Sequence, residues 1–432
     1  MRADTHAKLG LAAVESRLTR RRARESRFRG YCVAAVAFAV LFLLVLFTDI
    51  VRKGWSGFFQ TEIRLDVTFA PEVLDPGGSG DLDALAAADY APLWRDALAE
   101  TLGGVEGRSE RRQMFRMVSD AAFYRLRGMA LEDPSLLGTT RPVWLPASSA
   151  VDLIVKGKVS RDVAESGRPL DDLQMRWLRE LESQRRVDLR FDRGFFTQGD
   201  SRDPVMAGIA AAAVGSFWAM LVTLLISFPL GVATAIYLEE FAPRNNRFVD
   251  LIEVNINNLA AVPSIVFGLL GLAVFLNFFG LPRSAPLVGG LILALMTLPV
   301  IIIAARASIQ SVPPSIREGA YGLGATRMQV IQHHVLPMAF PGILTGTIIG
   351  MARALGETAP LLMIGMIAFI VDIPDGALDP ATALPVQVYL WADSPERGFV
   401  EKTSAAIMVL LVFLIAMNSV AVWLRRRWEL RM

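Results

Sequence analysis

Long apolar runs recur along this chain and restrict its fold more than any other feature of the sequence. A run of about 20 apolar residues is long enough to cross the hydrocarbon core of a bilayer as one helix. With 53% hydrophobic residues, the chain is also too apolar for an ordinary soluble domain. We therefore predict an all-α polytopic membrane protein with six transmembrane helices. The predicted spans are residues 30–51, 206–238, 251–279, 286–305, 342–371 and 404–424.

The region between the first two spans has a different composition. Residues 52–203 are rich in charge and contain no run long enough to span a bilayer, so they fit a soluble domain. Within them, TEIRLDVTF alternates like a strand. We predict an inserted α+β domain that carries no recognisable catalytic motif. Its predicted helices are residues 84–102, 108–131 and 171–187.

Two of these predicted helices have an identifiable apolar face. Apolar side chains that recur every three or four residues share one face of a helix. The face of the second helix is predicted to hold Met114, Met117, Ala121 and Tyr124. The face of the third is predicted to hold Leu173, Trp177 and Leu181.

The basic residues predict the topology. Lys and Arg concentrate on the cytoplasmic side of a membrane protein, and this chain has a basic segment at 1–29 and a basic tail, RRRWELR. Six spans place both termini and the loop 307–341 in the cytoplasm. Residues 52–203 then lie on the periplasmic side of a bacterial inner membrane. Residues 204–432 form a five-helix core. The run 30–51 could instead be a signal peptide, but its length and the following VRKGW favour an uncleaved anchor.

Several classes of function are excluded by composition. A net charge of +2 gives no argument for nucleic acid. The single cysteine, Cys32, permits no disulfide within the chain, and His6, His333 and His334 are too few and badly placed for a metal centre. The chain has no G-x-x-x-x-G-K-[ST] motif, which binds the phosphates of ATP in P-loop proteins. We predict no catalytic residue, metal or cofactor here, so any ATP must bind to another polypeptide.

The polar stretch EGAYGLGATRMQVIQHHVLP, residues 318–337, has an ordered pattern for a loop. Proline suits a first helical turn, so one helix is expected to begin near Pro313. Gly322 and Gly324 tolerate the positive φ of a tight turn. Thr326 and Gln329 have capping-box spacing, so they are expected to begin a second helix. Pro337 is expected to end it, and its apolar contacts are predicted to be Met328, Val330, Ile331 and Val335.

This stretch resembles the cytoplasmic EAA loop of ABC importer permeases. That pattern is EAA, three residues, G, nine residues and I-x-LP; here Gly319 replaces the first alanine and His334 replaces the isoleucine. The resemblance implies the core of a type I ABC importer permease, in which this loop docks onto an ATPase subunit. An amphipathic hairpin without a special role is the alternative. The residues that match the coupling positions are Glu318, Gly319, Ala320, Gly324, Leu336 and Pro337.

A second stretch, GMARALGETAPLLMIG at residues 350–365, resembles the ARxxGETAPL signature of phosphate permeases of the PstA and PstC type. The insert after the first span is similar to that of a longer PstA subtype. The resemblance implies a pathway for inorganic phosphate across the membrane lipid. It also implies three partners, which are a second, PstC-like permease, a cytoplasmic PstB-like ATPase dimer that binds ATP, and a periplasmic PstS-like phosphate-binding protein.

Three charged residues are candidates for the phosphate pathway. Arg353 and Glu357 fall within a predicted span, where charges are costly and face the bundle interior. They are four residues apart, so they can pair. One interpretation is a structural pair, and the other is an anion site whose arginine is occupied by Glu357 when substrate is absent. Arg306, at the end of the fourth predicted span, is either an anchor at the membrane surface or part of the same path.

Three other functions remain open from the sequence. A permease for another oxyanion, such as sulfate or molybdate, would share the architecture. A membrane sensor or scaffold could use 52–203 as its receptor, but it would need no ATPase-docking loop. A secondary transporter would likewise need no ATPase.

Four stretches within the predicted spans contain a proline. These prolines are consistent either with helix kinks or with a transport pathway. The four residues are Pro229, Pro263, Pro299 and Pro360.

Overall fold

Helices dominate the structure, which divides into the units Met1–Lys53 and Gly54–Met432. This computed structural model describes residues 2–78, 81–103, 107–243, 246–367 and 369–429, without the side chains of 2–20, 22–23, 424 and 428–429. The predicted tail RRRWELR lies partly outside the described residues. Among the described residues, five helices are long and apolar enough to cross a membrane, or six if one bent pair is counted as a span. The prediction of a helical, polytopic chain is confirmed.

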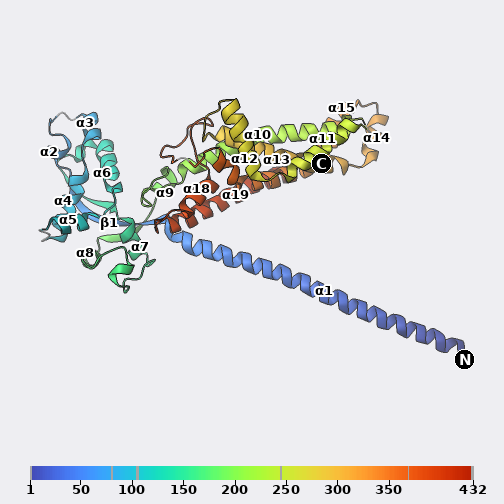
Figure 1. Cartoon of the computed structure of the whole chain (residues 1–432), viewed down its shortest axis with the longest axis horizontal. Helices are drawn as coiled ribbons and strands as arrows, with labels where there is room; N and C mark the ends of the chain where they lie inside the picture. The colour runs from blue at the N-terminus through green and yellow to red at the C-terminus, as the bar shows by residue number, and fades with distance from the viewer. Residues whose placement is uncertain (1, 79–80, 104–106, 244–245, 368, 430–432) are drawn as a thin grey trace. The chain divides into compact units, whose positions relative to one another are not determined.

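The first unit is one long helix, α1 (Arg2–Gly54), drawn in blue in Figure 1. It contains the predicted span 30–51 and residues 2–29 of the basic segment without a break. The apolar part of this helix has a mean hydropathy of 2.7 over an 18-residue window. The sequence predicted the apolar run but not that the basic segment would continue the same helix.

The inserted region is built on a three-stranded antiparallel sheet with the order β2-β1-β3. The central strand, β1 (Phe59–Thr68), matches the strand predicted from TEIRLDVTF. In the register of β1 and β2, Ile63 lies opposite Leu145, and Leu65 lies opposite Val143. The small sheet confirms the α+β character of the insert. The outer strands are β2 (Thr140–Pro146) and β3 (Val187–Phe191).

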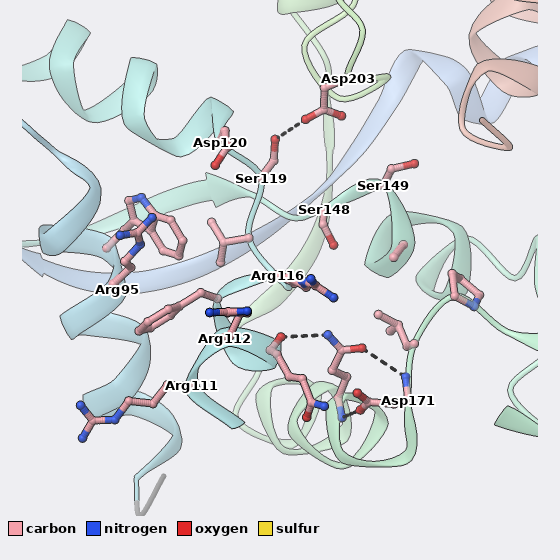
Figure 2. A pocket seen from close by; sticks show the side chains of 18 of the residues that line it. Arg95, Arg111, Arg112, Arg116, Ser119, Asp120, Ser148, Ser149, Asp171 and Asp203 are labelled. Atoms are coloured by element: carbon pink, nitrogen blue, oxygen red, sulfur yellow. Dashed lines mark hydrogen bonds between the residues drawn. The ribbon is translucent and has the colours of Figure 1, made fainter. Parts of the chain in front are cut away.

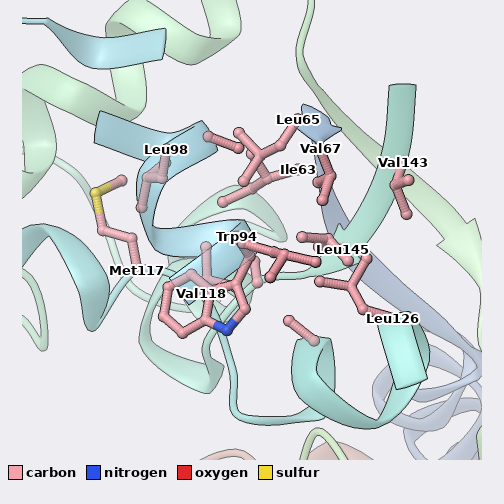
Figure 3. Packing of buried hydrophobic residues seen from close by; sticks show 14 of the residues in the cluster. Ile63, Leu65, Val67, Trp94, Leu98, Met117, Val118, Leu126, Val143 and Leu145 are labelled. Carbon is pink, nitrogen blue, oxygen red and sulfur yellow. The ribbon is translucent and has the colours of Figure 1, made fainter. Parts of the chain in front are cut away.

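One face of this sheet carries the hydrophobic core of the insert (Figure 3). Alternation along β1 directs Ile63, Leu65 and Val67 to that face, and all three are fully buried. Trp94 and Leu126 cover them from two of the helices. The short segments that complete the insert are η1 (Trp55–Phe58), α2 (Pro71–Leu74), η2 (Pro134–Leu136), α7 (Ser149–Val155), η3 (Glu165–Gly167) and α9 (Gly194–Thr197).

Two of the three helices predicted in the insert are each split in the structure. The segment 84–102 becomes α3 (Leu82–Ala87) and α4 (Ala91–Leu102), because Tyr90 and Pro92 begin a new helix. The segment 108–131 becomes α5 (Arg108–Phe115) and α6 (Ala121–Glu132).

The break between α5 and α6 corrects one predicted apolar face. Val118 leaves the helical path and bridges to Ala147 at the end of β2. The break changes the phase of the helical pattern. Met114 and Met117 are fully buried as predicted, whereas Tyr124 is exposed. The third predicted helix, α8 (Asp172–Ser183), is continuous, and it buries Trp177 and Leu181 as expected.

Helices of the C-terminal region form the core of predicted spans. Helix α10 packs along α13, and α13 packs against α16, as the green, yellow and orange ribbons in Figure 1 show. The helices are α10 (Ala210–Ile236), α11 (Arg247–Ala261), α12 (Ser264–Leu270), α13 (Pro286–Gln310), α14 (Pro314–Gly322), α15 (Arg327–Val330), α16 (Leu336–Leu355), α17 (Ala359–Met363), α18 (Leu384–Ala392) and α19 (Phe399–Glu429). Among the described residues, π-helical turns connect or extend them: η4 (Tyr237–Phe241), η5 (Gly271–Phe278) and η6 (Ile331–Val335).

The predicted span 251–279 is not one helix. Helix α11 and the segment Ser264–Phe278 meet at an angle of 104°. Pro263 lies at the bend, and Val262 before it has an extended backbone (φ −67°, ψ 132°). A proline disfavours the helical conformation of the preceding residue, which accounts for the bend. Pro229 and Pro299, in contrast, lie inside the uninterrupted helices α10 and α13.

The predicted span 342–371 is shifted toward the N-terminus in the structure. The apolar helix runs over Arg327–Leu355, and the chain leaves it at Gly356. Pro360 then lies in the first turn of α17, a separate short helix. The remaining spans agree more closely with prediction, although α19 begins five residues before 404.

Buried ion pairs connect the insert to the start of α19. Lys402 of α19 donates to Asp192, just after β3, with 2.5 Å between Nζ and Oδ2. Their side chains are only 8% and 6% exposed. Lys156, after α7, lies 3.3 Å from Glu401 and 2.6 Å from Asp152. The pairs Lys402–Asp192 and Lys156–Glu401 therefore fix the insert to the last helix.

Candidate functional site

The predicted coupling loop begins with a helix that ends in a defined turn. Helix α14 has Pro313 at its N-cap and Pro314 in its first turn, as expected near Pro313. At its other end, Ala325 N–H donates to the Ala320 carbonyl, and Gly324 N–H donates to the Tyr321 carbonyl. These two bonds form a Schellman motif, which needs a left-handed residue after the C-cap. Gly324 supplies it with a φ of +85°.

The second half of the loop begins as predicted and ends differently. Thr326 and Gln329 form the predicted capping box at the start of α15. The prediction that Pro337 ends this helix is wrong. The helix continues through the π turn η6 into α16, where Pro337 lies in the first turn. A π turn changes the hydrogen-bond register, so the helix accommodates the missing N–H of the proline without ending.

Helices α14 and α15 together form a projection from the core, and its inner and outer sides differ in burial. Ala320, Val330 and Val335 belong to one hydrophobic cluster with residues of α10, α13 and α16. Ile331 is also buried, so three of the four predicted apolar contacts are confirmed. Met328 is the exception, because its side chain is exposed.

The outer side of the projection is an exposed surface around the turn, which we call the tip. Leu323 is 92% exposed, and the neighbouring Tyr321 and Met328 are exposed as well. Glu318 and Gly319 are also exposed on α14. An exposed group of large apolar side chains is typical of an interaction surface. Sequence reasoning missed Tyr321 and Leu323, although their position beside the turn glycines was the available signal.

The other predicted coupling residues lie further along the same continuous segment. Leu336 and Pro337 are half-buried in the first turn of α16. His333 and His334 are exposed on the helix surface, and His333 Nδ1 lies 3.1 Å from the Gln329 carbonyl. The side chain of His6 lies outside the described residues.

An arginine in α14 connects the projection to the rest of the core. Arg317 donates to Glu240 of η4, with its Nε and Nη2 atoms at 3.1 and 3.0 Å from Oε1. It also donates to the carbonyls of Val312 and Ile309 at the end of α13. Glu240 is buried. The sequence gives no signal for this contact, because Arg317 lies 77 residues after Glu240.

Arg306 lies in a second part of the same charge network. Its Nε atom is 2.6 Å from Glu239 Oε1, and its Nη2 atom is 2.7 Å from Glu253 Oε1. Gln310 also donates to Glu239 at 2.9 Å. Glu239 is therefore held by two side chains of α13 and is only partly exposed. Neither role predicted for Arg306 included these two carboxylates, which join α13 to α11 and to the end of α10.

The charge network lines a cavity of about 960 Å³ between the ends of these helices. Arg327 of α15 lies over the Phe241 ring at 5.2 Å from its centroid, so the second helix of the projection also reaches this cavity. Arg317 and Arg327 therefore fasten the projection to η4 and to the end of α13. Arg306 in turn joins α13 to η4 and α11.

Arg353 and Glu357 lie at the far end of α16. Arg353 is in the last turn, and Glu357 follows the helix, so neither is in the middle of a span helix as predicted. The side chains are neighbours, with 3.6 Å between Arg353 Nε and Glu357 Oε1. Arg353 is 60% exposed, and its guanidinium makes no hydrogen bond within the described part of the chain. Its planar fork of donors is therefore available to an anion.

The structure thus has the long apolar helices of a multi-pass membrane protein, an exposed projection made of α14 and α15, and a charge network behind that projection. Residues 205–430 match the family model described as binding-protein-dependent transport system inner membrane component. The chain belongs to this family. Residues 15–165 match a domain of unknown function, DUF3333.

Several relatives have related names. A probable ABC transporter permease protein, YqgH of Bacillus subtilis, is 34% identical over 214 residues, which are 48% of this chain and 68% of the relative. The phosphate transport system permease protein PstA 1 of Mycobacterium tuberculosis is 31% identical over 50% of this chain and 70% of its own length. PstC of Haemophilus influenzae is 31% identical over 49% and 74% of the two chains. These relatives are permease subunits, which confirms the predicted class.

Solved structures of ABC importers are also similar in part. A chain of the MetNI methionine ABC transporter in an inward-facing conformation has a TM-score of 0.40 and 17% identity, over 50% of this chain and 91% of that chain. A chain of an alginate importer has a TM-score of 0.38 and 18% identity, over 50% of this chain and 78% of that chain.

Proposed function

We propose that this chain is a membrane subunit of an ATP-driven phosphate importer and forms part of the phosphate path through a bacterial inner membrane. The observation that carries the proposal is the helix Arg327–Leu355, which begins beside the exposed tip and ends beside Arg353. A docking surface and an anion-binding candidate thus occupy the two ends of one helix. The similarity to permeases named for phosphate transport supports phosphate as the anion.

The partners follow from this assignment. The tip would dock onto one subunit of a cytoplasmic ATPase pair that binds ATP, with Leu323 and Tyr321 as its apolar contacts. A second, similar permease would complete the transmembrane path. A periplasmic binding protein would deliver phosphate on the side of the insert. The basic segment 1–29 and the tail would lie in the cytoplasm, in agreement with the distribution of Lys and Arg.

The role of Arg353 in this proposal follows from its chemistry. A guanidinium donates two parallel hydrogen bonds to phosphate oxygens, and it stays charged at any physiological pH. Glu357 competes for the same donors, because its carboxylate lies 3.6 Å away. Phosphate that enters the path displaces Glu357, and the carboxylate recovers the arginine when phosphate leaves. Such exchange keeps binding weak enough for release.

The experiment that tests the proposal is uptake of labelled phosphate at low external concentration. Cells that lack the chain are compared with cells in which it is restored, in a strain without another phosphate system. We expect uptake to depend on the chain and to resist excess sulfate and molybdate. Uptake that is unchanged without the chain contradicts phosphate as substrate. Competition by sulfate or molybdate would instead assign the path to a broader class of oxyanions.

Variants of the pair test the residue assignment. Arg353→Gln is expected to lower uptake at least tenfold, because it removes a charge-assisted contact that contributes about 1.5–3 kcal/mol. Arg353→Lys should retain part of the activity, since the charge remains but the fork is lost. Glu357→Gln is expected to lower the KM for phosphate by removing the competitor. An Arg353→Gln chain that assembles and transports normally would exclude this arginine from the path.

A further inference from the structure

The insert contains a cavity of about 1090 Å³ that belongs to neither the tip nor the Arg353 site. Its walls come from α4, α5, the start of α6, the start of α7 and the segment leading into α8. Cavities of this size accommodate small molecules in many proteins. Six arginines line it: Arg95, Arg108, Arg111, Arg112, Arg116 and Arg168.

Fewer acidic than arginine side chains line this cavity, and hydrogen bonds within the insert hold half of the acidic ones. Asp203 accepts hydrogen bonds from Ser119 Oγ and from the N–H of Val205. Asp171 forms the capping box of α8 with Gln174. These bonds hold the two carboxylates at the wall. The four acidic residues of the lining are Asp120, Glu165, Asp171 and Asp203.

Helix α5 supplies most of the positive charge. Arg108 and Arg112 lie on it four residues apart, and Arg116 is its C-cap, so the three follow one face. At about 1.5 Å per residue, this stripe is roughly 12 Å long. Within the described part of the chain, Arg112 and Arg116 form no ion pair. One phosphate group is too small to contact the whole stripe, but a chain of linked phosphates can follow it.

Figure 2 shows how these side chains are placed. Arg112 and Arg116 extend into the space between Ser148 and Asp171, whereas Arg111 points away from it. Ser148 Oγ is buried and has no hydrogen-bond partner among the described residues. A buried hydroxyl without a partner costs free energy unless a ligand or water satisfies it. The cavity therefore combines unpaired guanidinium groups with an unsatisfied hydroxyl.

We propose that this cavity binds a small polyanion with two or more linked phosphate groups. Arginine forks match phosphate oxygens, and each terminal phosphate has three oxygens that can accept from both guanidinium and hydroxyl groups. The stripe Arg108, Arg112 and Arg116 favours an anion long enough to contact all three guanidinium groups. Ser148 contributes a neutral donor at one end. This site is separate from the proposed phosphate path.

The test is direct binding to the purified full-length chain by calorimetry. Tripolyphosphate is compared with inorganic phosphate and with a hexa-aspartate peptide at the same ionic strength. We expect tripolyphosphate to bind at least tenfold more tightly than either of the other two, and its affinity to fall as salt is added. No binding of tripolyphosphate overturns the proposal. Equal binding of inorganic phosphate would reduce the cavity to a single-oxyanion site, and tighter binding of the peptide would make it a protein-docking surface.

Variants locate the binding within the cavity. Arg112→Gln combined with Arg116→Gln is expected to weaken tripolyphosphate binding at least tenfold, since two charge-assisted contacts are lost. The same positions changed to Lys should give an intermediate loss. Arg176→Gln on α8 is the matched control, because Arg176 is exposed and does not line the cavity. Ser148→Ala should weaken binding by about threefold. Equal binding by the double Gln variant and the control contradicts the assignment, and the melting temperature of each variant reports whether the insert stays folded.

Discussion

Arg317 and Glu240 form the contact that ties the exposed projection to the core, through two hydrogen bonds to a single carboxylate oxygen. Glu240 is buried in η4, which continues α10, and Arg317 also donates to the carbonyls of Ile309 and Val312 at the end of α13. One guanidinium therefore joins three helices. Arg317 therefore links the projection to both η4 and α13.

Removal of one partner of this pair should uncouple the projection. Glu240→Gln leaves a half-buried guanidinium without its counter-charge, and we expect a loss of up to about 3 kcal/mol in the free energy of unfolding. Phosphate-stimulated ATP hydrolysis by the assembled complex should fall as well. The double variant Arg317→Met, Glu240→Leu should recover most of the stability but not the coupling. Arg247→Gln, an exposed arginine of α11, is the control. Loss of stability in the control equal to that of Glu240→Gln would contradict a specific role for the pair.

Leu323 should matter for assembly and not for folding. Its side chain is 92% exposed, so Leu323→Ser removes almost no buried contact within the chain. We expect an unchanged melting temperature and a loss of the ATPase subunit from the purified complex, because buried apolar side chains dominate docking interfaces. Leu323→Met should retain the subunit. Full retention of the ATPase by Leu323→Ser would show that the tip is not the docking surface.

Gly319 in α14 and Gly324 in the turn that follows this helix should respond oppositely to alanine. Gly324 has a φ of +85°, so Gly324→Ala forces a side chain into the left-handed region at a cost of about 1–2 kcal/mol. Gly319 lies inside α14, and a Cβ added to it would meet no atom within 4 Å, so Gly319→Ala should stabilise the helix by roughly 0.5–1 kcal/mol. Thermal unfolding of both variants checks the pair. Destabilisation by Gly319→Ala would indicate a hidden contact on this face.

The junction of Lys402 and Asp192 should be highly sensitive to single substitutions. Both side chains are more than nine-tenths buried, so Lys402→Met leaves Asp192 as an uncompensated buried charge. Breaking one side of a buried pair costs about 3–5 kcal/mol. The double variant Lys402→Met, Asp192→Leu should regain much of this loss, which a cycle of unfolding measurements can resolve. Additive effects of the two single substitutions would mean that the pair does not act as a unit.

Local patterns in the sequence were sufficient for much of the fold. Alternating apolar and polar residues predicted the strand β1. The three-residue spacing of Thr326 and Gln329 was enough to predict their capping box. The split between α5 and α6 did not follow, because the break depends on a bridge from Val118 to a strand that comes later in the chain. Pro337 was expected to end a helix, yet a π turn accommodates it.

The candidate site shows the same division. Residues that match a motif, such as Gly324 and Arg353, could be named in advance from the sequence. Their partners could not, because Arg317 and Glu240 are 77 residues apart and meet only through the packing of α10, α13 and α14. Leu323 was missed for another reason. A leucine in a loop is ordinary in a sequence, and only the structure shows that the side chain of Leu323 is almost fully exposed.

The helix Arg327–Leu355 has a mechanical consequence. It measures roughly 40 Å at about 1.5 Å per residue, and it connects the surface turn directly to the last turn that holds Arg353. A stiff rod of this length moves as a unit, and Arg317 and Glu240 line the same cavity as Arg327 at its first end. A tilt of a few degrees at one end becomes a displacement of ångströms at the other. A force applied by a partner at the tip would thus arrive at the arginine as motion, without any chemical signal passing along the chain.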